Sequence, residues 1–252
     1  IEMMPKIAGA TDPEICKVLT DAFEKRGMVF KLSAKVLEVK TNSVIYEENG
    51  QQKEIACDKV LLSAGRRPAT AGIGLETLGL QMDRAAIVTD RHMCTTVQNV
   101  YAVGDCNGKS MLAHTAYREA EVAVNHMLGI KDEMRYDVIP AVIYTDPEVA
   151  SVGHSKEGAE KLGMNVKEIK LPMSYAGRYL AENEGGKGFI KLVVDTDRNR
   201  LVGCHMVGSY ASEIIMTATM MVDTELPPAR LQKMVFPHPT VAEIIREAIF
   251  HV

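Results

Sequence analysis

The stretch Tyr-Ala-Val-Gly-Asp at residues 101–105 carries the clearest signal of the fold. Residues 100–103 form a short apolar run that predicts a strand, and helical spacing predicts a helix over residues 113–128. A strand that ends in Gly-Asp and leads into a helix places a carboxylate at the carboxyl end of a sheet, where ligands bind in open α/β folds. Asp105 could accept hydrogen bonds from sugar or polyol hydroxyls there. The alternative is an aspartate in a turn that caps the next helix.

Upstream of that stretch, helix and strand signals alternate. Asp12 followed by Pro13 predicts the start of a helix, and Gly27 predicts its end. A hairpin is predicted around Asn49-Gly50. Strands are predicted over 1–3, 29–32, 34–40, 43–46, 53–56 and 60–63. The first is typical of the end of a buried strand, and the last, short and mostly apolar, is typical of a strand buried in a parallel sheet.

The chain changes character after residue 136. Strands are predicted over 141–144, 149–154, 166–171, 189–195 and 201–207, and helices over 156–162, 211–223, 228–233 and 240–249. Strands in succession with helices gathered at the end predict an α+β domain, an antiparallel sheet with helices on one face. The helix over 211–223 carries more apolar side chains than one sheet face needs, which favours a homodimer through this region.

The composition indicates a globular chain. Of 252 residues, 46% are hydrophobic and 25% charged, and no apolar run approaches the roughly 20 residues needed to span a bilayer. We therefore expect a soluble protein that does not bind membranes, and no signal peptide is recognised at its start. The net charge is −4 without a basic block, which disfavours nucleic-acid binding.

The five cysteines are far apart, and no pair has the spacing of a zinc site or a redox motif. An odd, dispersed set of cysteines is typical of structural thiols in a reducing compartment, so we expect a cytoplasmic protein. The histidines show no metal-ligand spacing either, and no metal site is expected. The cysteines are Cys16, Cys57, Cys94, Cys106 and Cys204.

The stretch Met-Leu-Ala-His-Thr at residues 111–115 begins the helix predicted over 113–128. The free N–H groups and positive dipole end of a helix suit an anion or an electron-rich ring edge. Met111 and Leu112 are side chains that often contact small molecules. Ordinary core packing is the alternative, and the residues alone leave both open.

The stretch Phe-Pro-His-Pro-Thr at residues 236–240 predicts an acid–base group. Two prolines hold the backbone of His238 extended and keep it out of a helix. Thr240 is expected to N-cap the helix that carries Glu243. That carboxylate, five residues after His238, can turn back to Nδ1 and leave Nε2 as an acid or base. The alternative is a capping histidine on a surface loop.

Taken together, these motifs resemble the C-terminal part of the pyridine nucleotide–disulfide oxidoreductases. The resemblance includes Gly-Arg-Arg-Pro at residues 65–68 and covers essentially the whole chain. Residues 112–116, followed by Glu119 and Val122-Ala123, are most similar to the lipoamide dehydrogenase branch. The implied fold is α/β and α+β: partial FAD- and NAD-binding three-layer domains, then an α+β dimerisation domain with an antiparallel sheet. The implied domains are an NAD-binding part over 1–65, a returning FAD-binding segment over 66–136 and the dimerisation domain over 137–252.

The resemblance also implies roles for individual residues. His238 would be the acid–base partner of the substrate thiol, Glu243 would orient it, and the pair would reach across a homodimer to the other subunit's flavin. Asp105 would bind the FAD ribitol, Met111, Leu112, Ala113 and His114 would line the isoalloxazine, Gly65 would lie near the nicotinamide, Val36 near the adenine, and Glu2 would bind the adenosine ribose of NAD.

Departures from the family pattern shape the expected function. The Gly-x-Gly-x-x-Gly motif for FAD, the pair of redox cysteines and the Gly-rich loop for NAD do not occur here, and Phe236 stands where a second histidine is frequent. We therefore expect a portion of an enzyme about twice as long, inactive by itself. The reaction implied for the whole is dihydrolipoamide + NAD⁺ to lipoamide + NADH, with a lipoyl-bearing protein as partner.

Two alternatives from the sequence remain open. One is a non-catalytic homodimerisation module. The other is a related flavin disulfide reductase acting on mercuric ion, glutathione or trypanothione. The mercuric branch carries a vicinal cysteine pair near its C-terminus, whereas residues 248–252 here read Ala-Ile-Phe-His-Val.

Overall fold

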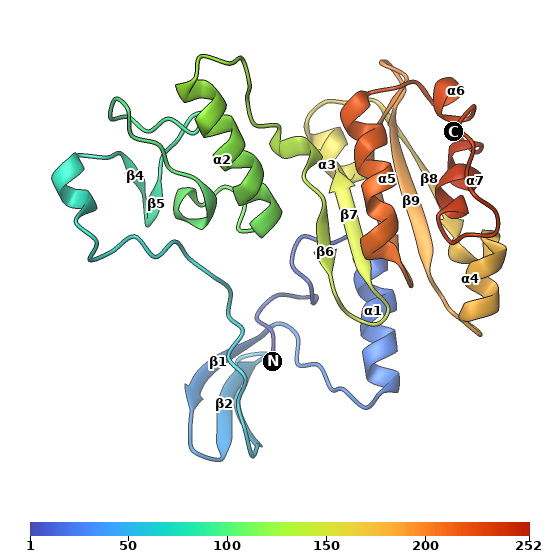
Figure 1. Cartoon of the computed structure of the whole chain (residues 1–252). Helices are drawn as coiled ribbons and strands as arrows, with labels where there is room; N and C mark the ends of the chain where they lie inside the picture. Colours follow the sequence, from blue (N-terminus) through green and yellow to red (C-terminus); the bar gives the residue numbers. More distant parts are fainter. The chain divides into compact units, whose positions relative to one another are not determined.

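The computed structural model describes all 252 residues, which form two compact units. The first unit comprises residues 1–60 and 137–252, and the second comprises residues 61–136 (Figure 1). The helices are all too short or too polar to span a bilayer.

A five-stranded antiparallel sheet forms the centre of the first unit. Its strand order is β6-β7-β10-β9-β8, and every neighbouring pair is antiparallel. The strands are β6 (Ala141–Ile143), β7 (Val149–Gly153), β8 (Val166–Pro172), β9 (Phe189–Asp195) and β10 (Arg200–Val207). The five strands predicted after residue 136 are thus confirmed to within about one residue at each end.

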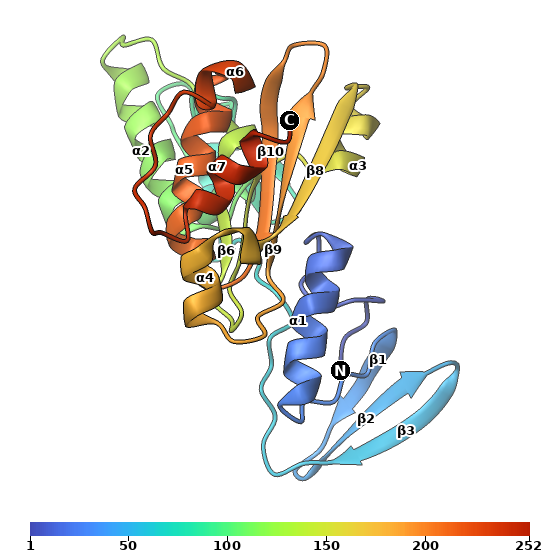
Figure 2. The same cartoon turned by 90° about the vertical axis from the view of Figure 1, so that its right-hand side faces the viewer.

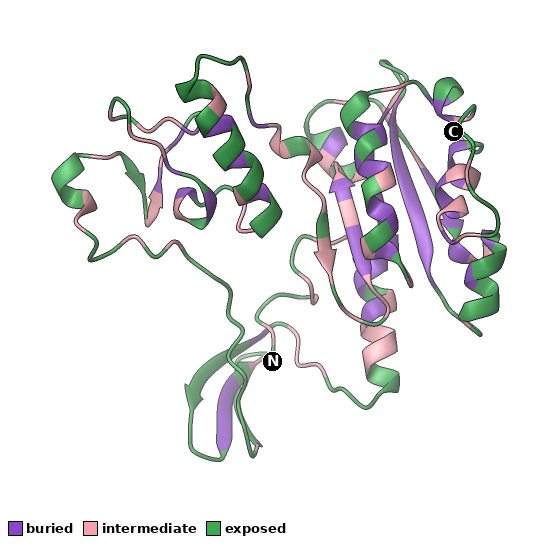
Figure 3. Cartoon of the chain, viewed as in Figure 1, coloured by how far each residue is buried: buried purple, intermediate pink, exposed green.

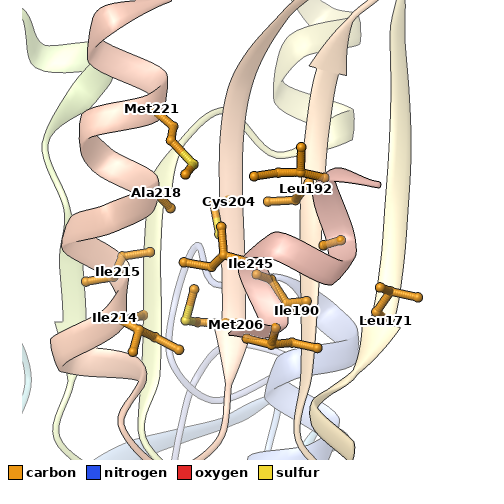
Figure 4. Packing of buried hydrophobic residues seen from close by; sticks show 14 of the residues in the cluster. Leu171, Ile190, Leu192, Cys204, Met206, Ile214, Ile215, Ala218, Met221 and Ile245 are labelled. Carbon is orange, nitrogen blue, oxygen red and sulfur yellow. The ribbon is translucent and has the colours of Figure 1, made fainter. Parts of the chain in front are cut away.

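Helices cover both faces of this sheet (Figure 2). On one face, Ile190 and Leu192 of β9 and Met206 of β10 pack against α5 (Ala211–Thr224) and α7 (Glu243–Ile249) (Figure 4). On the other face, α1 (Pro13–Lys25) and α3 (Lys156–Lys161) cover Phe189 and Val193 of β9.

The prediction of helices on one face only was therefore wrong. All seven residues of β9 are buried (Figure 3). Apolar side chains of β9 lie on both faces of the sheet, Ile190 and Leu192 on one and Phe189 and Val193 on the other, so both faces are covered. Two further helices, α4 (Gly177–Glu182) and α6 (Pro228–Leu231), and the 3₁₀ turns Tyr136–Val138 and Met173–Tyr175 complete the region after residue 136.

Helix α1 begins and ends where the sequence predicted. The Asp12 carboxylate accepts hydrogen bonds from the backbone N–H groups of Glu14 and Ile15, which satisfies two of the free donors of the first turn. Gly27, just past the helix, adopts a φ of +88°, a conformation that costs glycine little.

A three-stranded antiparallel sheet follows α1. Its strands are β1 (Ala34–Val39), β2 (Ser43–Glu48) and β3 (Gln51–Ala56), with β2 in the middle. Asn49 and Gly50 turn the predicted hairpin with φ values of +54° and +73°. Strands predicted over 1–3 and 29–32 do not form. Glu2 exchanges only isolated backbone bonds with this region, and Ser33, at a φ of +52°, interrupts the extended run.

The second unit consists mainly of turns packed on one long helix. It contains the 3₁₀ turns η1 (Leu75–Leu78) and η2 (Gly104–Asn107), the short strands β4 (Met82–Asp83) and β5 (Ala86–Ile87), and helix α2 (Ala113–Met127). Helix α2 confirms the helix predicted over residues 113–128, and its buried residues are Thr115, Glu119, Val122 and Ala123.

The strands predicted over 60–63 and 100–103 are absent. Leu61 and Leu62 are 91% and 82% exposed, and Tyr101 makes a single bridge to Cys94. A buried parallel strand needs a hydrogen-bonded neighbour on each side. Residues 60–63 pair with no strand of this chain, and residues 100–103 pair on one side only, with residues 93–95.

Candidate functional site

A tight turn presents Asp105 at the surface of the second unit. Gly104 begins this turn, η2, at a φ of +77°, and a Cβ added there would lie 3.3 Å from the Cβ of Ala116. The Asp105 carboxylate is exposed and accepts no hydrogen bond from the chain. Helix α2 has Leu112 at its N-cap and no side-chain cap, so Asp105 does not serve as the cap of the next helix. It is a free acceptor.

Helix α2 packs on this turn and begins without a capping side chain. Ala113 and His114, in its first turn, are exposed, and Met111 and Leu112 are half-buried just before it. The first N–H groups of the helix therefore lie next to partly exposed apolar side chains. Such an uncapped N-terminus suits an electron-rich ring edge.

Behind the turn, Glu119 is completely buried. Its Oε2 accepts hydrogen bonds from the Gly104 N–H at 2.6 Å and from Asn107 Nδ2 at 2.9 Å. Its Oε1 accepts the Tyr136 hydroxyl at 2.7 Å. Burial and this carboxylate raise the pKa of Tyr136.

We did not identify Glu119, Asn107 or Tyr136 as site residues from the sequence. The available signal was a charged residue at Glu119, in the middle of the stripe formed by Thr115, Val122 and Ala123 at helical spacing. A carboxylate at such a position is buried only when donors surround it.

The second unit offers the types of chemical group that FAD binding requires. Asp105 offers a free carboxylate for polyol hydroxyls, α2 offers uncapped N–H donors, and Met111 and Leu112 offer apolar surface for a ring. When bound, FAD would supply the transfer of electrons between a pyridine nucleotide and a disulfide.

Of the three residues expected to contact NAD, Glu2 and Val36 lie in the first unit and Gly65 in the second. The Glu2 carbonyl accepts the N–H of Ala34 at 3.0 Å, at the start of β1, and Val36 lies exposed two residues further along that strand. The Glu2 carboxylate is engaged by the Met4 N–H at 2.8 Å. Gly65 belongs to the second unit, with a φ of +96° and open space around it. These features do not by themselves define a nucleotide site.

The first unit carries the predicted histidine–carboxylate pair. His238 Nδ1 lies 2.8 Å from Glu243 Oε1, and Glu243 Oε2 accepts the Thr240 N–H at 2.8 Å. The hydrogen bond from the Thr240 N–H is the main cause that lowers the pKa of Glu243, and the hydrogen bond with His238 is the second. The His238 side chain is 79% exposed and that of Glu243 only 18%, so the carboxylate is held while the ring faces outward.

The role expected for Thr240 was wrong. Helix α7 begins at Glu243 with Ala242 at its N-cap, and the Thr240 hydroxyl donates to the Pro237 carbonyl at 2.9 Å. Thr240 instead helps to hold the loop that carries His238. With Nδ1 engaged by Glu243, the exposed Nε2 is the nitrogen available for proton transfer.

Comparison with known families now adds to this geometry. Residues 1–120 match the family described as pyridine nucleotide-disulphide oxidoreductase, and residues 139–249 match its dimerisation domain. The chain belongs to the pyridine nucleotide-disulphide oxidoreductases. Both candidate sites lie within the matched ranges, with His238 and Glu243 in the dimerisation domain and Asp105 in the segment before it.

Relatives within the pyridine nucleotide-disulphide oxidoreductases include dihydrolipoyl dehydrogenases. Those of Thermus scotoductus and Chlamydia muridarum are 39% and 37% identical to this chain, and each alignment covers 98% of it. The alignments cover 55% and 53% of those two proteins, so the chain spans about half the length of the curated relatives.

Solved structures of two other proteins show the same fold. LpdA of Mycobacterium tuberculosis superposes with a TM-score of 0.89 at 26% identity, over 99% of this chain and 55% of LpdA. The HOCl-induced flavoprotein disulfide reductase RclA of Escherichia coli gives 0.85 at 25% identity, over 99% and 58%. Dihydrolipoyl dehydrogenases use FAD and NAD.

Proposed function

We propose that this chain is part of a flavin-dependent disulfide oxidoreductase that converts dihydrolipoamide and NAD⁺ to lipoamide and NADH. The observation that carries the proposal is the hydrogen bond of 2.8 Å between His238 Nδ1 and Glu243 Oε1, on a histidine whose ring is exposed. The dihydrolipoyl dehydrogenases among its relatives support the choice of substrate.

His238 is the general base in this proposal. A dihydrolipoamide thiol has an ordinary pKa near 8.5 and is a poor nucleophile until it is deprotonated. Nε2 takes the thiol proton, and the resulting thiolate attacks one sulfur of the enzyme disulfide as the other sulfur leaves as a thiolate. Glu243 holds the ring in the tautomer that leaves Nε2 unprotonated, and it stabilises the imidazolium that forms. The five cysteines of this chain are free, so the redox disulfide is expected from residues beyond these 252.

The remaining residues bind cofactors in this proposal. Asp105 accepts hydrogen bonds from the FAD ribitol. Residues 111–114 line the flavin ring, with the N-terminus of α2 directed at its electron-rich edge. Glu2, Val36 and Gly65 contribute to the NAD site together with further residues of the protein.

We also infer the setting in which the protein works. The match of residues 139–249 to a dimerisation domain supports a homodimer in which His238 serves the flavin of the partner subunit. A lipoyl-bearing protein of a 2-oxoacid dehydrogenase or glycine cleavage complex is the expected partner. The five free cysteines support a reducing location, the cytoplasm.

The test is the substitution His238→Gln in the full-length flavoprotein. Lipoamide-dependent turnover should fall by roughly 10²–10⁴-fold, the usual contribution of a general base. Hydride exchange between NADH and flavin, which deprotonates no thiol, should change little. His251→Gln is the matched control, because that exposed histidine lies just beyond the same helix, α7.

Two outcomes would contradict the proposal. Equal losses in both half-reactions would mean that His238 supports the fold or the dimer. Absence of flavin absorption at about 450 nm in the purified full-length protein, a property of the cofactor itself, would favour the non-catalytic dimerisation module.

A further inference from the structure

We propose that Glu119 is a positioning residue for flavin binding: its buried carboxylate sets the turn that presents Asp105. The inference rests on the proposed FAD site and adds a residue that touches no ligand itself. Glu119 is 0% exposed, and both of its oxygens already accept hydrogen bonds from the chain. It therefore acts through the turn.

The turn depends on this carboxylate at both of its ends. Gly104, which precedes Asp105, is buried, and its N–H donates to Glu119 Oε2 at 2.6 Å. Asn107, two residues after Asp105, donates from Nδ2 to the same oxygen at 2.9 Å, and its Oδ1 accepts the Lys109 N–H at 3.0 Å. Without Glu119, a buried backbone donor would lose its partner at the residue before Asp105.

Tyr136 supplies the third hydrogen bond, from the last residue of the second unit. The hydroxyl, protonated at neutral pH, donates to Oε1 at 2.7 Å, and burial beside this carboxylate raises its pKa further. The Glu119 side chain on α2 thus links the turn Gly104–Asn107 to Tyr136 at the end of the second unit. The direction in which Asp105 points therefore depends on Glu119.

Two substitutions of Glu119 distinguish a role of its hydrogen-bonding position from a role of its charge. In E119Q, the amide oxygen can accept from Gly104 and Asn107 while the amide nitrogen donates to the oxygen of Tyr136. The freed hydroxyl can then turn to Met93 Sδ, 3.7 Å away. In E119D, the charge is kept but the side chain is one methylene shorter, so it cannot reach all three donors. A positioning role predicts that Gln substitutes better than Asp.

The experiment measures FAD affinity by titrating flavin-stripped full-length protein with FAD. E119A should raise the Kd at least about 10-fold, E119D by a similar factor, and E119Q by less than about threefold. E121A is the matched control, a glutamate of the same helix with 66% of its side chain exposed, and should leave the Kd unchanged. In the flavin-free protein, hydrogen exchange at the Gly104 amide should speed up in E119A and not in E119Q.

A double-mutant cycle with D105A decides whether Glu119 acts through Asp105. If it does, E119A should raise the Kd of the D105A protein by less than about twofold. Additive losses, an unchanged Kd in E119A, or better binding by E119D than by E119Q would overturn the inference. Should E119A fail to fold, the order of E119Q and E119D still decides. If the wild-type protein bound no FAD, or if D105A alone left the Kd unchanged, the proposed function would fail instead.

Discussion

The carboxylate of Glu243 makes two contacts with the loop that precedes it. Oε1 holds the His238 ring and Oε2 accepts the Thr240 N–H, so one side chain sets both the imidazole and the backbone beside it. Glu243→Gln keeps a hydrogen-bonding group but removes the charge that stabilises a protonated ring. We expect lipoamide-dependent turnover to fall by less than the roughly 10²-fold that marks loss of a general base. Steady-state kinetics of E243Q beside H238Q measures this, and a loss equal to that of H238Q would refute it.

The lowered pKa of Glu243 sets the pH range in which its charge is present. Its ordinary value is 4.5, and hydrogen bonds from Thr240 and His238 hold it below that. The charge of Glu243, and whatever it contributes, is therefore present above about pH 4.5 and is lost only as the pH falls further.

The two candidate sites differ in how far the sequence could predict them. His238 and Glu243 are five residues apart, and their contact depends on local backbone direction, which two prolines and a helix start already indicate. Glu119 accepts hydrogen bonds from three donors in two segments, the turn Gly104–Asn107 and Tyr136, up to 17 residues away, and no local pattern places those segments together. The sequence alone therefore predicts the pair of His238 and Glu243. The hydrogen bonds of Glu119 to the turn Gly104–Asn107 can be recognised only in the folded structure.

The N-terminus of helix α1 is joined to β9 by a buried cation. Lys191, only 6% exposed, places Nζ 2.8 Å from Asp12 Oδ2 and 2.5 Å from Glu14 Oε2. Burial disfavours its charge, but the hydrogen bonds to Asp12 and Glu14 outweigh this and raise its pKa. Lys170 and Lys191 in turn hold the pKa of Glu14 at about 2.

Lys191→Met should therefore destabilise the first unit. The change leaves the buried Asp12 carboxylate without its cation, and breaking a buried pair from one side typically costs about 3–5 kcal/mol; we expect about 2–4 because Glu14 is half exposed. Urea unfolding at pH 7 measures this, with Lys161→Met, an exposed lysine of α3, as the control. A change below about 0.5 kcal/mol, the usual range for surface substitutions, would count against the buried cation.

Helix α2 is tied to the loop after it by a second ion pair. Arg118 donates from both terminal nitrogens to Asp132, and Asn125 donates to Asp132 at 2.8 Å, so the pKa of Asp132 falls from 3.8 to about 2. Asp132→Asn should cost about 0.5–1 kcal/mol at neutral pH, as for a good surface pair. A lowered carboxyl pKa stabilises the fold above the unfolded value. The difference between wild type and variant should thus be full above about pH 4 and shrink as the pH falls through about 2. Thermal unfolding over that range is the measurement, and a difference that does not shrink between about pH 4 and about pH 2 would refute the pair.

Elements with local signals were the ones that could be predicted. The capped start of α1, the Asn49-Gly50 hairpin and the five strands after residue 136 all follow from neighbouring residues. The strand predicted over 60–63 does not form, because a parallel strand forms only with neighbours that its own residues do not specify. The buried residues of α2 do not follow hydrophobic spacing, because Glu119 and Thr115 face inward toward polar partners.

For the whole molecule, the proposed homodimer needs a different surface from the one first expected. Ile214, Ile215, Ala218, Met221 and Val222 suggested surplus apolar area on α5, but all five are buried within the chain's own core. The exposed apolar side chains of that helix are Met216 and Met220, at 54% and 58% exposure. Methionines adapt to varied contacts and suit such a surface.

We expect the double substitution Met216→Glu and Met220→Glu to convert a dimer into a monomer. An interface of more than about 1,000 Å² tolerates a buried unpaired charge poorly. Light scattering coupled to gel filtration at micromolar concentrations gives the mass. Leu162→Glu is the control, a side chain equally exposed at 63% but at the end of α3 on the other face of the sheet. If the double variant remained dimeric, α5 would not form the interface.

The contact between Asp12 and Lys191 joins residues 179 positions apart, which has a consequence for synthesis on the ribosome. At about 5–20 residues per second, α1 leaves the ribosome roughly 10–35 s before β9 exists. During that interval Ile15 and Leu19 lack the sheet on which they pack in the finished protein. The nascent chain therefore carries an amphipathic helix without its sheet partner for that interval, a form that chaperones bind and that aggregates when they do not.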